Sequence, residues 1–320
     1  MTRVLLVRMS SLGDIIHTFP VATDLARHVP GVEVHWAVEG EYVDLARMHP
    51  AVGKVITVAT RRWRRAPFAA ATWREIRAAR RALRAEPYDA ILDTQGLLKS
   101  VWVAKQARGP VHGFGRGTAR EPFVAHFYDR TYEFAPSDHK IFRYRSVAAH
   151  AFDYRFAPQI DYGLAVPPAP AFAPAAPYVV LMHSTARAAK LWDEGSWSAV
   201  ARYLDDKGYA CVLPWGNDAE RRRAERLAAP LARSLVAPGM AIREAAGLLG
   251  HARAVIGLDT GFTHLAAALR VPVVGIFCDS EPLDAHPAGM GPATYRGGVG
   301  RPPRFEEVVE ALAEVAPGLA

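Results

Sequence analysis

Residues 254–277 read AVIGLDTGFTHLAAALRVPVVGIF. The apolar runs at 254–258 and 273–277 are typical of buried strands, and the segment 262–269 between them is typical of a helix. Parallel neighbouring strands need a long crossover connection, usually a helix, whereas antiparallel strands can be joined by a short turn. Two strands that are joined by a helix are therefore expected to lie parallel. This stretch therefore predicts a strand–helix–strand unit with the turn Asp259-Thr260-Gly261 at the start of its helix.

The same alternation of strands and helices extends along the whole chain of 320 residues, which indicates an α/β fold with parallel sheets. It is interrupted once, by the proline-rich stretch VPPAPAFAPAAP at 166–177, which favours a semi-rigid linker. We therefore predict two doubly wound, Rossmann-like domains with a cleft between them. Their bounds are 1–165 and 178–303, and a last amphipathic helix, 304–320, is expected to return to the first domain as in related folds. Predicted strands are 3–9, 32–38, 54–59, 89–94, 111–114, 178–183, 210–214, 234–237, 254–258 and 273–277; predicted helices are 14–28, 42–48, 67–85, 97–107, 197–207, 218–229, 242–249 and 262–269.

The composition limits the classes of function. No apolar run approaches the length of about 18 residues that a membrane helix needs, and no signal peptide is evident, so a cytoplasmic protein is expected. Cys211 and Cys278 lie in strand-like runs without metal-ligand spacing, which favours buried apolar roles over a zinc site. The net charge of +7 comes mostly from arginine and favours an anionic partner.

The first predicted strand runs into the turn Met9-Ser10-Ser11-Leu12-Gly13-Asp14, without the glycine fingerprint of dinucleotide sites. Ligands of such sheets bind at the carboxyl ends of the strands. Asp14 has two interpretations: it caps a helix start, or it is a general base that takes a proton from an attacking hydroxyl.

An arginine-rich segment follows the third predicted strand. It begins with RRWRR at 61–65, which the pattern places at the end of that strand, and continues on the next helix to Arg84. A solvated helix face accounts for the helical part, whereas arginines around Trp63 favour the binding of carboxylates or phosphates. Arg116 to Arg120 form a second basic stretch. Nucleic acid is the rival partner, but no nucleic-acid-binding motif accompanies the charge.

The second half offers an anion site. The turn Asp259-Thr260-Gly261 opens a helix whose free N–H groups suit a diphosphate, although helix capping alone also explains it. Lys190 is either a surface lysine or a group that neutralises a leaving phosphate. Glu220 is either a first-turn helix residue or a ligand of ribose hydroxyls.

Taken together, these stretches resemble the lipopolysaccharide heptosyltransferases. The similar segments are RVLLVRMSSLGDIIHTFP, VITVATRRWRRAPF, YDAILDTQGLLKS, GTAREPFVAHFYDR, HSTARAAKLW, PWGNDAERRRAERLA and GLDTGFTHLAAAL, which occur in family order over nearly the whole chain. RRWR, DTQGLLKS and TAREP are similar to the type I branch of that family.

This resemblance implies a GT-B fold, in which the first domain binds the acceptor and the second binds the donor. It implies inverting transfer of heptose from ADP-heptose to O5 of the first Kdo of Kdo-lipid A, without a metal or other cofactor. It also implies a place at the cytoplasmic face of the inner membrane. By the resemblance, Asp14 and Lys190 are catalytic; Thr185, Lys190, Glu220, Met240, Asp259, Thr260, Gly261 and His264 bind the donor; and Ser11, Gly13, Arg61, Arg62, Arg65 and Arg120 bind the acceptor.

Other functions remain open on the sequence. A type II heptosyltransferase or a nucleotide-sugar epimerase shares the same architecture. A module that binds nucleic acid or a membrane surface without catalysis rests on the charge alone.

Overall fold

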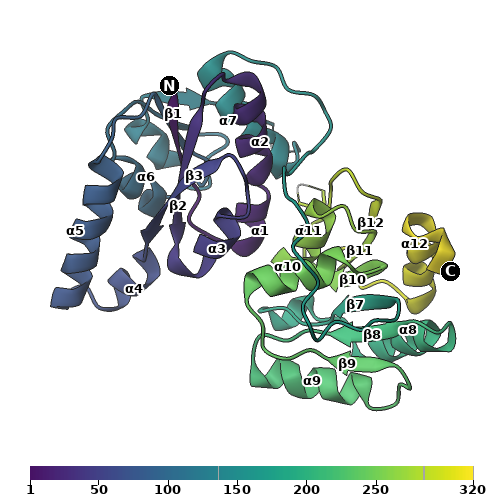
Figure 1. Cartoon of the computed structure of the whole chain (residues 1–320). Helices are drawn as coiled ribbons and strands as arrows, with labels where there is room; N and C mark the ends of the chain where they lie inside the picture. The colour runs from purple at the N-terminus through teal and green to yellow at the C-terminus, as the bar shows by residue number, and fades with distance from the viewer. Residues whose placement is uncertain (136, 284, 320) are drawn as a thin grey trace. The chain divides into compact units, whose positions relative to one another are not determined.

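The computed structural model describes residues 1–135, 137–283 and 285–319, and the chain forms two compact units (Figure 1). The first unit comprises 1–158 and 162–164, and the second comprises 159–161 and 165–320. The proline-rich stretch 166–177 belongs to the second unit and contains no helix or strand. Fixed proline φ angles and missing N–H donors explain why it does not join a sheet.

The first unit is built around a parallel sheet in the order β3-β2-β1-β4-β5-β6. Its central strands are buried on both faces, as the continuous apolar runs predict. The strands are β1 Arg3–Val7, β2 Glu33–Glu39, β3 Val52–Val58, β4 Ala90–Asp93, β5 Val111–Phe114 and β6 Arg130–Tyr132; the helices are α1 Leu12–Ile16, α2 Phe19–His28, η1 Gly40–Tyr42, α3 Val43–Ala46, α4 Thr60–Arg65, α5 Ala70–Arg84, α6 Leu98–Ala104, η2 Pro122–Phe127 and α7 Lys140–Phe152.

The second unit repeats this winding, with the sheet order β12-β11-β10-β7-β8-β9 and parallel pairing throughout. Its strands are β7 Tyr178–Met182, β8 Ala210–Leu213, β9 Ser234–Val236, β10 Ala254–Leu258, β11 Val273–Phe277 and β12 Ala293–Gly297; its helices are η3 Ala188–Lys190, α8 Glu194–Asp206, α9 Asp218–Ala228, α10 Ile242–Gly250, α11 Gly261–Ala268, α12 Phe305–Val315 and η4 Pro317–Leu319.

Each sheet has a switch point, where the chain reverses the direction in which it adds strands. In the first unit β1 pairs with both β2 and β4, and in the second β7 pairs with both β8 and β10. The crevice outside the carboxyl ends of such a pair is the usual ligand position of open parallel sheets. Each unit therefore provides one such position.

Some predicted elements need correction. The helix expected over 14–28 is divided into α1 and α2, since Pro20 stands in the first turn of α2 and cannot continue an earlier helix. RRWRR does not end a strand: β3 stops at Val58, and these residues form α4. The pattern also misses β6, α7 and β12.

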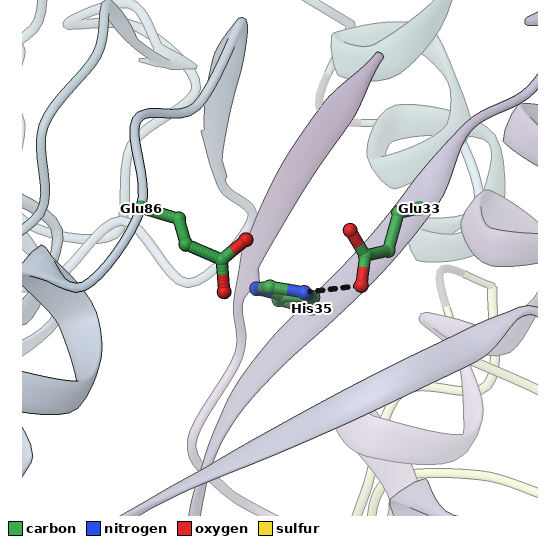
Figure 2. A group of neighbouring side chains, drawn as sticks. All are labelled: Glu33, His35 and Glu86. Atoms are coloured by element: carbon green, nitrogen blue, oxygen red, sulfur yellow. Dashed lines mark ion pairs between the residues drawn. The ribbon is translucent and has the colours of Figure 1, made fainter. Parts of the chain in front are cut away.

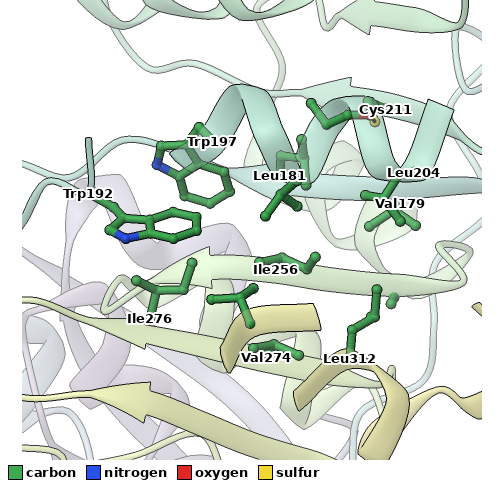
Figure 3. Packing of buried hydrophobic residues seen from close by; sticks show 14 of the residues in the cluster. Val179, Leu181, Trp192, Trp197, Leu204, Cys211, Ile256, Val274, Ile276 and Leu312 are labelled. Carbon is green, nitrogen blue, oxygen red and sulfur yellow. Dashed lines mark hydrogen bonds between the residues drawn. The ribbon is translucent and has the colours of Figure 1, made fainter. Parts of the chain in front are cut away.

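The last helix does not return to the first unit. Val308, Ala311, Leu312 and Val315 on α12 are buried in the core of the second unit, together with Trp192, Trp197, Ile256 and Ile276 (Figure 3). The apolar residues of α12 recur at helical spacing, so burying them against β11, β12 and α8 removes the whole stripe from water. The expectation that 304–320 packs on the first domain is therefore wrong.

Both cysteines are free and buried, as the sequence predicts. None of the helices in the described parts of the chain is long and apolar enough to cross a bilayer.

Candidate functional sites

Asp14 lies in the first turn of α1, directly beyond β1, and its side chain is 25 % exposed. The Ser11 backbone N–H and hydroxyl both donate to Asp14 Oδ2, at 3.3 and 3.0 Å. Tyr144, on α7, donates its hydroxyl to Oδ1 at 3.4 Å. The capping interpretation and the base interpretation are therefore compatible: the carboxylate closes the turn and still faces solvent.

Two cations keep Asp14 ionised. The Arg8 guanidinium is 4.0 Å from Oδ2 and lies over the Tyr144 ring, 4.2 Å from its centroid. Burial alone raises the pKa of Asp14, but the charges of Arg8 and Lys140 and the Ser11 hydrogen bonds outweigh it, so the pKa lies below its ordinary value. At neutral pH the side chain is a carboxylate that can accept a proton.

The neighbouring strand β4 supports this turn. Asp93, at the end of β4, is fully buried and accepts hydrogen bonds from the Gln95 backbone at 2.8 Å and from the Tyr128 hydroxyl at 2.9 Å. Gln95 in turn accepts from the Met9 backbone at 2.9 Å. These hydrogen bonds oppose the burial that raises the pKa of Asp93, and they make this residue a structural acceptor below the surface of the site.

A basic cluster lies beside the turn. Lys99, on α6, donates to Ser10 Oγ at 3.2 Å. Burial and the positive charges of Arg61, Arg64 and Arg120 lower the pKa of Lys99, while the charge of Glu39 opposes this, so Lys99 experiences a net positive field from α4 and the loop after β5. Such a group of cations favours a polyanionic ligand.

The predicted acceptor residues are only partly brought together. Ser11 and Gly13 flank Asp14, and Arg61 and Arg120 act on Lys99. Arg62 is turned toward α5, where it forms an ion pair of 2.7 Å with Glu75. Arg65 is exposed at the end of α4.

In the second unit, Asp259 directly follows β10 and holds two predicted donor residues. Lys190 Nζ is 2.5 Å from Oδ2, and His264 Nε2 is 3.4 Å from Oδ1. Burial opposes ionisation of Asp259, but the hydrogen bonds from His264 and Lys190 lower its pKa well below the ordinary value. Lys190 is thus a cation fixed at the amino end of α11, although it lies on η3 and not at a strand end.

The other predicted donor residues lie at the same edge of the sheet. Thr185 follows β7, Glu220 follows β8 and Met240 follows β9, while Thr260 caps α11 and Gly261 begins it. The Glu220 carboxylate accepts from the Gly216 backbone and from Asn217 Nδ2, each at 2.8 Å. Both oxygens thus close the turn at the start of α9, and the predicted contact of Glu220 with ribose hydroxyls stays a prediction.

Four residues near these sites were not predicted. Arg8, Lys99 and Tyr144 contact the turn that follows β1, and His183 is buried at the end of β7. Burial lowers the pKa of His183 to about 4, so its ring is neutral. Only Arg8 carries a signal in the sequence: it is a charged residue that ends an apolar strand at the switch point.

A separate cluster lies at the opposite, amino end of the first sheet. Glu33, His35 and Glu86 place potential metal-ligand atoms within 4.8 Å of one another (Figure 2). Arg3 forms ion pairs with both glutamates, at 2.9 and 2.8 Å, and Lys54 contacts Glu86 at 3.2 Å. His35 contacts Glu33 at 3.1 Å. These cations already balance the carboxylates, so a structural ion-pair network accounts for the cluster.

Comparison with known proteins agrees with the geometry. Residues 76–306 match the model of glycosyltransferase family 9 (heptosyltransferase). The chain is 42% identical to lipopolysaccharide heptosyltransferase 1 of Pseudomonas aeruginosa over 88% of its length and 79% of that protein. It is 40% identical to the protein of the same name from Escherichia coli K12, over 88% of this chain and 89% of that protein.

Solved structures give the same result for the fold. The structure described as E. coli heptosyltransferase WaaC with ADP superimposes with a TM-score of 0.90 at 35% identity, covering 98% of this chain and all of that one. The complex of WaaC with ADP-2-deoxy-2-fluoro heptose gives a TM-score of 0.85. The predicted GT-B fold and the family resemblance are confirmed, and the chain belongs to glycosyltransferase family 9, the heptosyltransferases.

Proposed function

We propose that this enzyme is a lipopolysaccharide heptosyltransferase 1, which transfers heptose from ADP-heptose to O5 of the first Kdo of Kdo-lipid A. The observation that carries the proposal is the presence of two complementary sites, each at the switch point of its sheet. One offers an ionised, partly exposed carboxylate, and the other offers a lysine fixed at a helix N-terminus. The identity of about 40% to proteins of that name supports the choice of substrates.

In the proposed reaction the second unit binds the donor. Lys190 and the free N–H groups of α11 hold the diphosphate of ADP-heptose, where negative charge develops as the bond from the anomeric carbon to phosphate oxygen breaks. Thr185, Glu220, Met240 and Thr260 surround the rest of the donor. Because Asp259 holds Lys190 and is itself contacted by His264, the cation is in place before the substrate arrives.

The first unit binds the acceptor and supplies the base. The O5 hydroxyl attacks the anomeric carbon, its proton passes to Asp14, and ADP leaves with the bonding electrons, so the configuration inverts. The low pKa of Asp14 makes it a weak base, which suits a proton that is released only as the new bond forms.

The basic cluster of the first unit fits the acceptor. Lys99, Arg61, Arg64 and Arg120 concentrate positive charge beside Ser11 and Asp14, and Kdo carries a carboxylate that arginine binds in bidentate fashion. Arg62 and Arg65 extend this charge along α4. We propose that ADP-heptose is a co-substrate, that no cofactor is needed, and that the enzyme acts at the cytoplasmic face of the inner membrane.

The experiment is a measurement of ADP release from ADP-heptose with three acceptors, namely none, Kdo-lipid A and a core that already carries the first heptose. We expect release that needs Kdo-lipid A and survives EDTA, with addition of one heptose to the acceptor by mass spectrometry. Release without an acceptor contradicts the proposal in favour of an epimerase or hydrolase. Preference for the heptosylated core contradicts it in favour of a type II enzyme.

A further inference from the structure

The helix α5 carries a strongly basic face that the proposed reaction does not use. It contains five arginines, Arg74, Arg77, Arg80, Arg81 and Arg84, and one acidic residue, Glu75. At about 100° per residue these arginines fall within roughly 120° of the helix circumference. All five are exposed, while Thr72, Ala79 and Leu83 on the opposite face are buried.

These five arginines outnumber the acidic residues of their helix, where Glu75 is the one carboxylate. In the parts of the chain that the structure describes, none of the five guanidinium groups has an ion pair of the kind that ties Arg62 to Glu75. Their side chains enclose an open hollow of about 830 Å³ that only residues of α5 line. A positive surface of this kind attracts counterions from solution and favours an extended anionic partner.

The arginine-rich helix α9 shows that this imbalance is not a general property of the chain. It has four arginines and three acidic residues. Arg221 pairs with Glu225 at 2.9 Å, and Arg226 pairs with Glu194 at 2.7 Å. Its charge is therefore largely neutralised within the fold, as on an ordinary solvated helix.

Exposed aromatic side chains accompany the basic face. Phe68, just before α5, is 96 % exposed, and Trp73, in its first turn, is 51 % exposed. At 100° per residue Trp73 lies within the arc of the arginines. Exposed aromatic rings next to arginines are typical of helices that lie in the interface of a lipid bilayer, where the rings enter the headgroup layer and the cations contact phosphates.

We propose that the face of α5 formed by Arg74, Arg77, Arg80, Arg81 and Arg84, together with Phe68 and Trp73, docks on the surface of an anionic phospholipid bilayer. This deepens the proposed action at a membrane by assigning it to a surface that is distinct from the acceptor cluster around Lys99. The exposed aromatic residues favour a bilayer over duplex DNA, whose phosphates bind through charge alone. α5 packs along the edge strand β3, so it is a rigid platform and not a flexible tail (Figure 1).

The test is co-sedimentation of the full chain with vesicles of phosphatidylcholine and with vesicles that also contain phosphatidylglycerol. Neither contains Kdo or lipid A, so binding is measured independently of the proposed acceptor and reaction. The variant is Arg77→Gln/Arg81→Gln/Arg84→Gln, which keeps helix propensity. Since each arginine near an anionic surface contributes about fivefold, we expect partitioning to the anionic vesicles to fall on the order of 100-fold.

The matched control is Arg202→Gln/Arg222→Gln/Arg253→Gln, which removes the same charge from exposed positions of the second unit. We expect it to bind nearly as wild type, and Phe68→Ser/Trp73→Ser to bind about tenfold more weakly. Transfer to a deacylated, soluble acceptor should be unchanged in the α5 variant, whereas transfer to acceptor in anionic vesicles should fall. Equal loss in the two arginine triples contradicts the proposal. Equal binding of the wild-type protein to the two kinds of vesicle also contradicts it. So does binding to duplex DNA at physiological salt that is tighter than binding to the vesicles and is abolished in the α5 variant.

Discussion

Asp14 and Asp259 follow different central strands, β1 and β10, of two sheets with the same strand order, and they are used differently. Each follows a strand of the switch-point pair, and their side chains are 25 % and 17 % exposed. Asp259 is in direct contact with the Lys190 ammonium and the His264 ring, at 2.5 and 3.4 Å. Asp14 accepts hydrogen bonds from the neutral hydroxyls of Ser11 and Tyr144, and the Arg8 guanidinium lies 4.0 Å from its Oδ2.

The comparison teaches that a lowered pKa does not by itself identify a base. The pKa is lowered for both aspartates, for Asp259 mainly by direct hydrogen bonds from His264 and Lys190 and for Asp14 mainly by the charges of Arg8 and Lys140. A carboxylate whose oxygens are held by a lysine and a histidine serves to position them. The hydrogen bonds that Asp14 accepts from Ser11 and Tyr144 come from neutral groups, and its side chain still reaches solvent, so it can take a proton.

The largest effect is expected for Asp14→Asn. The amide keeps the shape of the turn but cannot take a proton, so kcat should fall about 10³-fold while the KM for ADP-heptose stays near that of wild type. Steady-state kinetics with Kdo-lipid A check this. Asp44→Asn, which changes an exposed carboxylate on α3, is the control and should retain full activity. Turnover of Asp14→Asn within tenfold of wild type would remove Asp14 from the mechanism.

A smaller kinetic effect, accompanied by a loss of stability, is expected for Asp259→Asn. Lys190 and His264 lose their anionic partner, so the KM for ADP-heptose should rise about tenfold and the free energy of unfolding should fall by about 2 kcal/mol at neutral pH. Asp14→Asn should change stability much less. Urea unfolding measures both effects. If the two substitutions lower the free energy of unfolding equally, the proposed difference between the two sites is contradicted.

The pH dependence of that loss has a definite sign. Because the folded-state pKa of Asp259 is lowered, its contribution to stability is present above the unfolded-state pKa of 3.8 and is lost as the pH falls through the folded-state value. The difference between wild type and Asp259→Asn should therefore be constant near neutrality and shrink only in acid. A difference that grows as the pH falls would contradict this assignment.

The sequence predicts the fold better than it predicts these contacts. β10 and β11 have the predicted bounds because buried apolar runs end at clear turns. β6 and β12, with the sequences RTY and ATYRG, are short, partly exposed and polar. Their sequences carry no strand pattern, and they become strands because they pair with the edge of a sheet. For the candidate sites, it is the family resemblance that predicts roles for individual residues, namely Asp14, Lys190 and Asp259.

What the sequence could not predict is how distant residues meet. Lys190 and Asp259 are 69 residues apart, and Tyr144 and Asp14 are 130 residues apart. No spacing rule connects them, because the winding of each sheet decides which loops become neighbours. The same reason explains why Lys99 and Arg64 were missed: α4 and α6 both begin beyond the carboxyl ends of strands of the first sheet, β3 and β4.

The smallest expected effect concerns the charge that acts on Asp14 from a distance. Arg8→Met removes the guanidinium 4.0 Å from Oδ2, so the burial that raises the pKa of Asp14 is less opposed. The acid limb of the kcat/KM profile reports the base of the free enzyme, and it should move to higher pH by about one unit. Arg8→Lys keeps the charge and should restore most of the wild-type profile, and Lys140→Met should give a smaller shift in the same direction. If Arg8→Met lowers activity equally at every pH, Arg8 supports the turn through its contact with Tyr144 and not through its charge, and the distinction between distant and direct stabilisation of the two aspartates no longer holds.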